Sequence, residues 1–149
     1  MLIIYTTPSC SSCRKAKKWL DEHRIKYIEK NIFNEKITIK DIDAMLERAE
    51  NGFEDIISTR SKVVKECNVD LESMTTNELK KFIAENPSIL KRPIMIDEDK
   101  MQVGYNDEEI RVFIPKRLRE IIMETRISDF ETDPRTPLER YIDELEGRE

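Results

Sequence analysis

Cys10 and Cys13, separated by two serines, are the residues whose type and spacing point most directly to chemistry. They lie between a short apolar run and a segment with helical periodicity, so Cys10 is expected at a helix N-terminus. Unpaired backbone N–H groups and the helix dipole there stabilise a thiolate, as does the positive charge of Arg14 and the lysines that follow. The spacing predicts a redox-active disulfide in which Cys10 attacks and Cys13, one turn further, resolves.

A zinc site is the alternative interpretation of a CxxC pair. The chain has no second CxxC, and its one histidine, His23, lies ten residues beyond Cys13. A four-ligand cage cannot be completed at familiar spacing, so redox chemistry is favoured and neither a metal nor a cofactor is expected. Cys67, the third thiol, is either a further redox thiol or glutathione acceptor, or a small, partly buried apolar residue; the last is favoured.

The elements that must position the pair follow from hydrophobic periodicity. The pattern predicts a strand over Leu2–Tyr5, a helix from about Ser11 or Ser12 to His23, and a strand over Tyr27–Asn31. This order is typical of a right-handed βαβ unit, which would place Cys10 at the turn between the first strand and the helix.

The middle of the chain is predicted to be helical and its last third mixed. An apolar stripe from Ile39 to Ala49 is followed by Asn51 and Gly52, residues typical of a helix stop. Further helices are expected over the following segments: Ser61–Cys67, a helix capped by Thr75 and Glu78 and ended by Asn86–Pro87, Asp107–Ile114, one from Leu118, and one capped by Thr136. A hairpin is expected from Ile94–Ile96 and Met101–Val103.

These elements predict an α/β fold: a thioredoxin-like fold with a four-stranded mixed sheet and an inserted helical lobe. The expected main domain covers residues 1–124. Its redox part spans about 1–33 and 88–124, and the helical insertion about 34–87. Residues 125–149 are expected to form an acidic C-terminal tail with a short helix.

The charge balance argues against a stand-alone DNA-binding protein. The chain of 149 residues has a net charge of −5, and residues 125–149 hold four arginines and eight acids. Proteins that bind DNA alone usually carry a basic excess that neutralises phosphates. No apolar run approaches the ~20 residues needed to span a membrane, and Met1–Tyr5 does not resemble a signal peptide. We therefore expect a cytoplasmic protein without specific DNA binding of its own.

Five segments, in order, resemble those of the Spx family of transcriptional regulators. They are Tyr5–Ala16, Asn31–Phe33, Asp55–Lys62, Arg92–Ile94 and Gln102–Asn106. The resemblance covers roughly residues 1–118, and several motifs in register make it far more specific than CxxC alone.

The resemblance implies a global regulator of thiol-stress and oxidative-stress genes that binds the C-terminal domain of the RNA polymerase α subunit. It implies that Cys10 and Cys13 form the redox switch and that Gly52 belongs to the docking surface. Arg60 and Arg92 match arginines that stabilise a thiolate or anion near Cys10. Pro93 matches the cis proline that faces the active thiol in thioredoxin-like folds.

The resemblance also implies that an ATP-dependent protease working with an adaptor keeps the cellular level of the protein low. The segment from about Ile127 to Glu149 is longer and more acidic than the family pattern, and it lacks the hydrophobic end that a protease could grasp. The tail helix is expected to pack on the body, bind a partner or be disordered.

Two enzyme functions are the rivals. A glutaredoxin-coupled arsenate reductase could use Cys10, Arg14, Arg60 and Arg92, but it resembles this chain less, because such reductases have one active-site cysteine and a further arginine where Gly104–Asn106 stands here. A general dithiol–disulfide oxidoreductase would share the Cys10–Cys13 switch. The regulator is preferred, and no enzyme activity is expected.

Overall fold

The computed structural model describes residues 1–59, 62–67 and 70–147. Its strands are β1 (Leu2–Thr6), β2 (Tyr27–Asn31), β3 (Ile94–Asp97) and β4 (Lys100–Val103). Its α-helices are α1 (Ser11–Glu22), α2 (Ile39–Leu46), α3 (Phe53–Ile56), α4 (Lys62–Cys67), α5 (Thr76–Glu85), α6 (Lys116–Glu124) and α7 (Pro137–Leu145). Short 3₁₀ helices cover Leu71–Ser73, Pro87–Ile89, Glu109–Phe113 and Ile127–Glu131.

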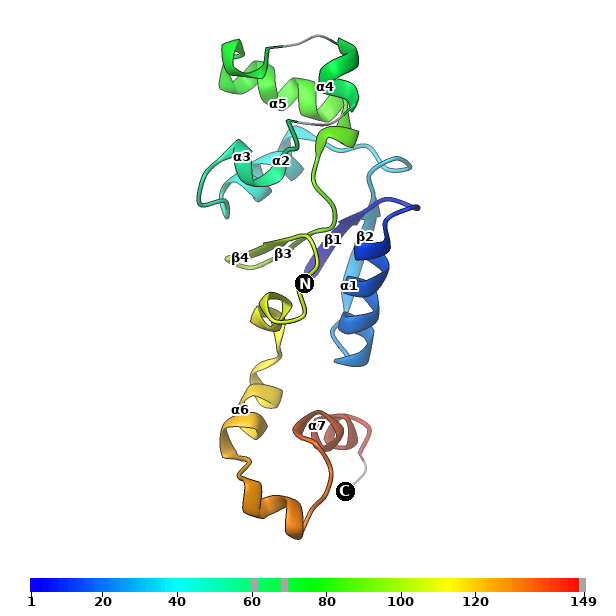
Figure 1. The fold of residues 1–149 in the computed structure, drawn as a ribbon, viewed down its shortest axis with the longest axis vertical. Coiled ribbons are helices and arrows are strands. Elements are labelled where there is room, and N and C mark those ends of the chain that lie inside the picture. The colour runs from blue at the N-terminus through cyan, green and yellow to red at the C-terminus, as the bar shows by residue number, and fades with distance from the viewer. Residues whose placement is uncertain (60–61, 68–69, 148–149) are drawn as a thin grey trace.

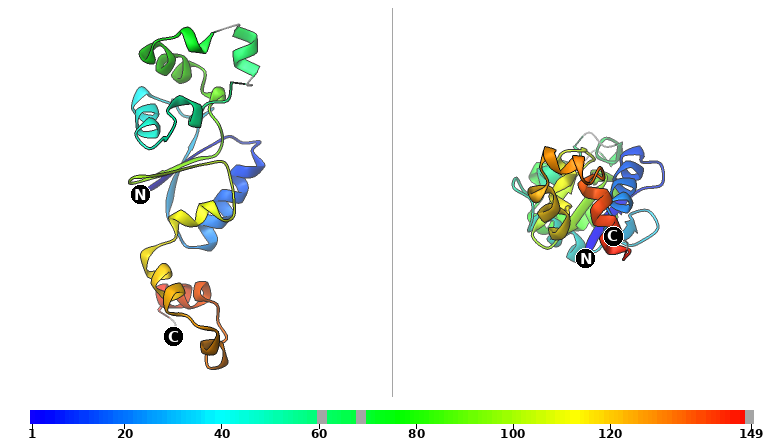
Figure 2. Two further views of the ribbon diagram at one scale, coloured as in Figure 1. Left: turned by 60° about the vertical axis from the view of Figure 1, so that its left-hand side comes forward. Right: turned by 90° about the horizontal axis from the view of Figure 1, so that it is seen from below.

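The molecule is elongated, with the sheet at its middle (Figure 1). Helices α2 to α5 form one end and α6 with α7 forms the other, while α1 lies against the sheet between them (Figures 1 and 2). The helices α2 to α5 fall within the stretch expected as an insertion between the two halves of the sheet.

The sheet is four-stranded and mixed, as the sequence predicts. Its strand order is β2-β1-β3-β4. β1 pairs with β2 in parallel, and β3 pairs antiparallel with both β1 and β4. Because β1 and β2 are parallel and joined by α1, the segments that follow both strands lie at the same sheet edge.

Alternation along the strands divides the interior into two apolar clusters. In β1, Leu2 and Ile4 face one cluster and Tyr5 faces the other, as the two-residue period of a strand requires. The cluster on the helical-insertion side holds Tyr5, Ile32, Ile37, Ile42, Met45, Ile56, Ile57, Leu79, Ile83, Ile89, Leu90, Ile94 and Ile96. The opposite cluster holds Leu2, Ile4, Ala16, Trp19, Leu20, Met95, Ile110, Phe113, Ile114, Leu118, Ile121 and Tyr141.

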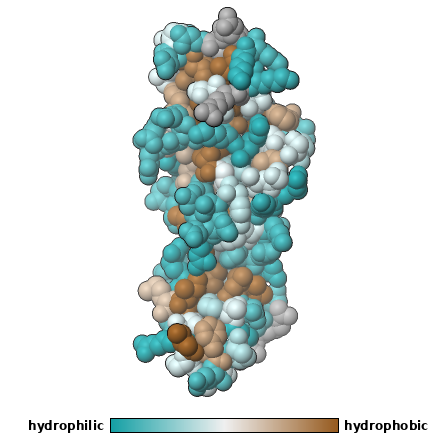
Figure 3. All heavy atoms as spheres, viewed as in Figure 1, coloured by the Kyte–Doolittle hydropathy of each residue, from teal (hydrophilic) through white to brown (hydrophobic). Residues whose placement is uncertain are grey.

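The C-terminal segment packs on the body, one of the three outcomes expected for it. Thr136 caps α7 by accepting a hydrogen bond from the Glu139 backbone N–H, as predicted. Tyr141 of α7 is 6% exposed and belongs to the same cluster as β1 and α1. Arg117 of α6 donates to both carboxylate oxygens of Glu144, at 2.8 and 2.7 Å. In Figure 3, hydrophobic residues also gather on the surface at this end of the molecule.

Two predicted elements differ from the structure. The helix expected over Ile39–Ala49 ends at Leu46. Beyond it, the chain forms tight turns in which the Arg48 N–H donates to the Met45 carbonyl and the Ala49 N–H donates to the Leu46 carbonyl. Residues 107–114 contain a 3₁₀ helix, Glu109–Phe113, rather than an α-helix. The N–H groups of Glu108 and Glu109 bond to the Asn106 side chain, which starts a tighter turn.

Among the described residues, no helix is long and apolar enough to cross a membrane.

Candidate redox site

Cys10 is the N-cap residue of α1. Its backbone is extended, with φ −92° and ψ 110°, and its Sγ accepts a hydrogen bond of 3.1 Å from the Cys13 backbone N–H. Sulfur thus occupies the place usually taken by a serine or aspartate oxygen at the start of a helix. A backbone amide at the helix N-terminus therefore points at the Cys10 sulfur, an arrangement found at many reactive cysteines.

Cys13 lies one turn into α1 and differs from Cys10 in burial. It is 1% exposed, whereas Cys10 is partly exposed, and both are free thiols. Burial and the neighbouring Cys10 raise the pKa of the Cys13 thiol to about 12, against smaller opposing effects of the Thr7 backbone and the Arg92 charge. This difference fits the predicted roles, in which Cys10 meets the oxidant and Cys13 attacks only Cys10.

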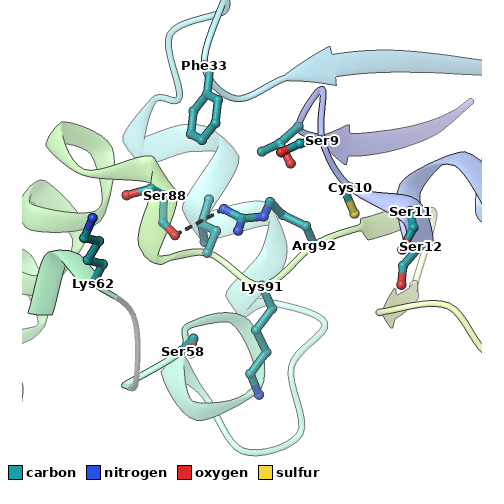
Figure 4. A pocket seen from close by; sticks show the side chains of 12 residues that line it. Ser9, Cys10, Ser11, Ser12, Phe33, Ser58, Lys62, Ser88, Lys91 and Arg92 are labelled. Atoms are coloured by element: carbon teal, nitrogen blue, oxygen red, sulfur yellow. Dashed lines mark hydrogen bonds between the residues drawn. The ribbon is translucent and has the colours of Figure 1, made fainter.

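A cavity of about 550 Å³ opens beside Cys10 (Figure 4). Its described lining consists of hydroxyl-bearing, cationic and apolar side chains, and no acidic side chain belongs to it. The lining residues are Thr7, Ser9, Cys10, Ser11, Ser12, Phe33, Ser58, Lys62, Ser88, Leu90, Lys91 and Arg92. Positive charge beside an open thiol stabilises a thiolate and attracts anionic reactants.

Arg92 forms part of the cavity wall, whereas Pro93, directly after it in the chain, is buried and does not line the cavity. The Arg92–Pro93 peptide bond is cis, and Arg92 lines the Cys10 cavity. The Arg92 guanidinium donates a hydrogen bond of 3.2 Å to the Ser88 carbonyl. Figure 4 shows this guanidinium directed toward Ser88, with Cys10 on its other side. The Arg92 charge acts to lower the pKa of Cys13, and among the described residues Arg92 has no hydrogen bond to sulfur.

Arg60 and Gly52 are the other two residues expected from the resemblance. Arg60 falls outside the described residues. Gly52 does not line the Cys10 cavity; it is the N-cap of α3, with φ +66° and ψ −140°. The interpretation of Gly52 as the stop of the preceding helix is wrong, because α2 ends six residues earlier and the positive φ serves the start of α3. A Cβ built on Gly52 would meet no heavy atom within 4 Å, so its surroundings are open.

Sequence reasoning missed Phe33 and Ser88 as parts of the site. Phe33 is 56% exposed and follows β2, at the sheet edge where β1 leads into Cys10. The parallel pairing of the two strands was a usable signal, since loops after parallel neighbours meet at one edge. Ser88 had no comparable signal, because its place depends on how the insertion folds back onto the sheet.

Within the part of the chain that the structure describes, no group of three or more His, Cys, Asp or Glu side chains could hold a metal ion.

Comparison with known proteins places the chain in a family. The ArsC family model matches residues 5–113. The global transcriptional regulator Spx of Bacillus subtilis is 51% identical over 119 residues, which cover 80% of this chain and 91% of that protein. The chain belongs to the Spx family, within the wider ArsC family. A Bacillus cereus member, global transcriptional regulator Spx 1, is 54% identical over the same coverage.

A solved structure agrees with this assignment. An ArsC-family-related protein from Bacteroides fragilis is 31% identical and superimposes with a TM-score of 0.63, covering 72% of this chain and 92% of that one. The Spx relatives are named as transcriptional regulators and not as enzymes. As a member of the Spx family, the chain is a transcriptional regulator with a thioredoxin-like fold rather than an arsenate reductase.

Proposed function

We propose that this chain is a redox-responsive regulator that docks on the C-terminal domain of the RNA polymerase α subunit. Its docking surface includes Gly52, and its output is set by a Cys10–Cys13 dithiol–disulfide switch. The observation that carries the proposal is the bond from the Cys13 N–H to the Cys10 Sγ at an open, cationic cavity. It supports an activated thiol with a second thiol within one helical turn.

The switch needs an oxidant, for which a peroxide is sufficient. The Cys10 thiolate attacks a peroxide oxygen, the O–O bond breaks, and Cys10 becomes a sulfenic acid while the departing oxygen leaves as water after protonation. The Cys13 sulfur then attacks the Cys10 sulfur, losing its proton, and a second water leaves as the S–S bond forms. Two thiols thus give up two electrons and two protons to one hydrogen peroxide, which becomes two waters.

The surroundings of Gly52 support a docking role. The position is partly exposed, its Cβ space is open, and exposed Glu50, Asn51 and Glu54 surround it in sequence. A residue without a side chain permits close approach of a partner backbone. We extend the proposal to cytoplasmic location, to the absence of specific DNA binding by the chain alone, and to turnover by an adaptor-assisted ATP-dependent protease.

Binding to the isolated C-terminal domain of the RNA polymerase α subunit tests the docking proposal. We expect a one-to-one complex by calorimetry, lost in Gly52→Arg and largely kept in Gly52→Ala. Both variants carry the same cost of a side chain at positive φ, so they separate the bulk of arginine from backbone strain. The proposal fails if the natural chain binds in neither redox state, or if Gly52→Ala and Gly52→Arg lose binding equally while both stay folded.

The switch is tested separately by peroxide treatment of the reduced chain. We expect a Cys10–Cys13 disulfide in the peptide spectrum, absent from Cys10→Ala and Cys13→Ala. Oxidation of Cys10 to sulfinic acid with no disulfide would contradict the role of Cys13.

A further inference from the structure

The Cys10 cavity and the segment that carries Gly52 are joined by one short stretch of backbone, Leu90–Pro93. Lys91 and Arg92 of this stretch line the Cys10 cavity. The same two residues line a second cavity, of about 610 Å³, whose wall includes Glu50 and Asp55 on either side of Gly52. Lys91 and Arg92 therefore form the partition between the redox site and the Gly52 segment.

Hydrogen bonds tie this partition to α3. The Lys91 backbone N–H donates to the Ile56 carbonyl at 2.8 Å, and the Lys91 Nζ donates to the Glu54 carbonyl at 3.0 Å. One residue earlier, Leu90 forms an isolated antiparallel bridge with Ile57. Figure 4 shows the Lys91 side chain leaving the partition away from Cys10, on the side of Ser58.

α3 is short, and besides these contacts it is held by Ile56, which is fully buried in the apolar cluster on the helical-insertion side. It has four residues, and Gly52 caps it without a side-chain hydrogen bond. Helices this short do not persist on their own, because one or two internal bonds cannot offset the entropy of fixing the chain. The bonds from Lys91 therefore add to the packing of Ile56 and to the Asn51–Asp55 hydrogen bonds in setting the position of α3 and of Gly52 at its start.

We propose that Lys91 is a positioning residue that couples the redox state of Cys10–Cys13 to the docking surface at Gly52. The inference rests on the proposed function and adds the route of its regulation. Disulfide formation moves the Cys10 Sγ from the Cys13 amide toward the Cys13 sulfur, within the cavity that Lys91 and Arg92 line. The response of the Lys91–Arg92 backbone passes to α3 through the bonds to Ile56 and Glu54, which shifts Gly52.

Coupling of this kind must be reciprocal. If oxidation changes the affinity for the α-subunit domain by some factor, binding of that domain changes the thiol–disulfide equilibrium constant by the same factor. A fivefold change in affinity corresponds to about 20 mV in the midpoint potential of a two-electron couple. The change in affinity on oxidation and the shift in midpoint potential on binding therefore report the same coupling free energy. If Lys91 had a purely structural role, its replacement would change neither of them.

The experiment compares four forms of the chain: Lys91→Met, the chain with its natural Lys91, Lys91→Arg and Lys62→Met. All carry Cys67→Ser, so that only Cys10 and Cys13 titrate. Lys62→Met is the matched control, because Lys62 also lines the Cys10 cavity but has an ion pair to Glu66 and no hydrogen bond to α3. For each chain, the dissociation constant for a cysteine-free α-subunit domain is measured reduced and oxidised, and the midpoint potential with and without that domain.

We expect the natural chain to show a reduced-to-oxidised affinity ratio of about fivefold or more, in one direction, matched by its potential shift. In Lys91→Met the affinity ratio should fall to within about twofold of unity, and the potential shift should shrink to match, while binding persists. Lys91→Arg should restore the ratio and the shift because it keeps the donor. Lys62→Met should keep the ratio. Lys91 is exposed, so Lys91→Met should fold; Lys91→Gln, too short to reach the Glu54 carbonyl, serves if it does not.

Other outcomes overturn the coupling. An unchanged ratio in Lys91→Met, an equal loss in Lys62→Met, or total loss of binding in Lys91→Met would each remove Lys91 from this role. Equal affinities of the natural chain in both redox states would remove the coupling and leave the docking proposal standing. Absence of binding in both states would instead overturn the proposed function, and the inference with it.

Discussion

At the scale of single residues, one helical turn separates two thiols with very different surroundings. Cys10 caps α1 and opens to a cavity, whereas Cys13 points into the interior and is 1% exposed. Thiolate content and access together decide the reactivity of a thiol. The chemical asymmetry of the pair therefore comes from the turn of the helix and not from the cysteines themselves.

Alkylation of the folded, reduced protein at pH 7 should show this asymmetry. With its pKa at about 12, Cys13 is ionised to only about one part in 100,000 at that pH. We expect iodoacetamide to label Cys10 at least about tenfold faster than Cys13, as located by fragmentation of the peptide that holds both. The same peptide in denaturant is the control, where the two rates should converge. Equal rates in the folded protein would contradict the structure.

The raised pKa of Cys13 also makes the stability of the fold depend on pH. Because the folded-state pKa of about 12 exceeds the ordinary value of 9.0, the protonated thiol stabilises the fold below about pH 9, and this contribution is lost as pH rises toward 12. We expect the free energy of unfolding of the reduced protein to fall more steeply across this interval than that of Cys13→Ala. The tyrosines titrate in both proteins and cancel in the comparison. Parallel curves would show that Cys13 is not the group responsible.

At the scale of elements, Asp41 joins the helical insertion to the sheet. Its carboxylate accepts hydrogen bonds from the Tyr5 hydroxyl at 3.0 Å, from Lys30 Nζ at 2.9 Å and from the Thr38 backbone N–H at 2.9 Å. Burial alone would raise its pKa, but these bonds together hold the pKa of Asp41 below its ordinary value. Two strand residues and the N-cap of α2 thus meet on one side chain.

Asp41→Ala should lower the free energy of unfolding by about 1–3 kcal/mol, because partly buried donors lose a charged acceptor. The matched control on the same helix is Asp43→Ala, which removes a partly exposed ion pair with Lys80 and should cost less than about 1 kcal/mol. Since the folded-state pKa is lowered, the Asp41 contribution is present above about pH 4 and lost as pH falls further. Urea denaturation at pH 7 and pH 3 measures both effects, and equal losses in the two variants would contradict this account.

At the scale of the whole molecule, the C-terminal segment completes the second apolar cluster. Residues 114–149 lie beyond the match to the ArsC family model, yet Leu118, Ile121 and Tyr141 are buried in the same apolar cluster as residues of β1 and α1. Ion pairs from Arg117 to Glu144 and from Arg24 to Glu146 lie at the surface around this contact. The body and the tail therefore share a core.

Replacing Tyr141 should destabilise the whole chain and not only the tail. We expect Tyr141→Ala to lower the free energy of unfolding by about 3 kcal/mol in a single transition, as for other buried aromatic side chains. Arg117→Ala, which removes only exposed bonds between α6 and α7, should cost clearly less. Thermal unfolding followed by circular dichroism measures both. If Tyr141→Ala unfolds at the same midpoint temperature as the unmutated chain, the tail is not part of the cooperative unit.

Local patterns in the sequence were enough for the elements and for the type of chemistry. β2, the start of α1, the β3–β4 hairpin and the caps at Thr75 and Thr136 were all predicted, because periodicity and capping depend on near neighbours in the chain. The CxxC pair at a strand–helix junction likewise needs no long-range information. Family resemblance added site roles for Arg92, Pro93 and Gly52, which no local pattern indicates.

Only the tertiary structure decided which cysteine is open and what surrounds it. Cys13 is buried because α1 packs on the sheet. The Cys10 cavity is lined in part by Phe33, Ser88 and Lys91, which come from segments far away in the sequence. The role of Gly52 at the start of α3 and the packing of α7 on α6 have the same origin. Burial, charge at a distance and shared cores depend on which segments meet in space, and that is settled by the packing of the whole chain.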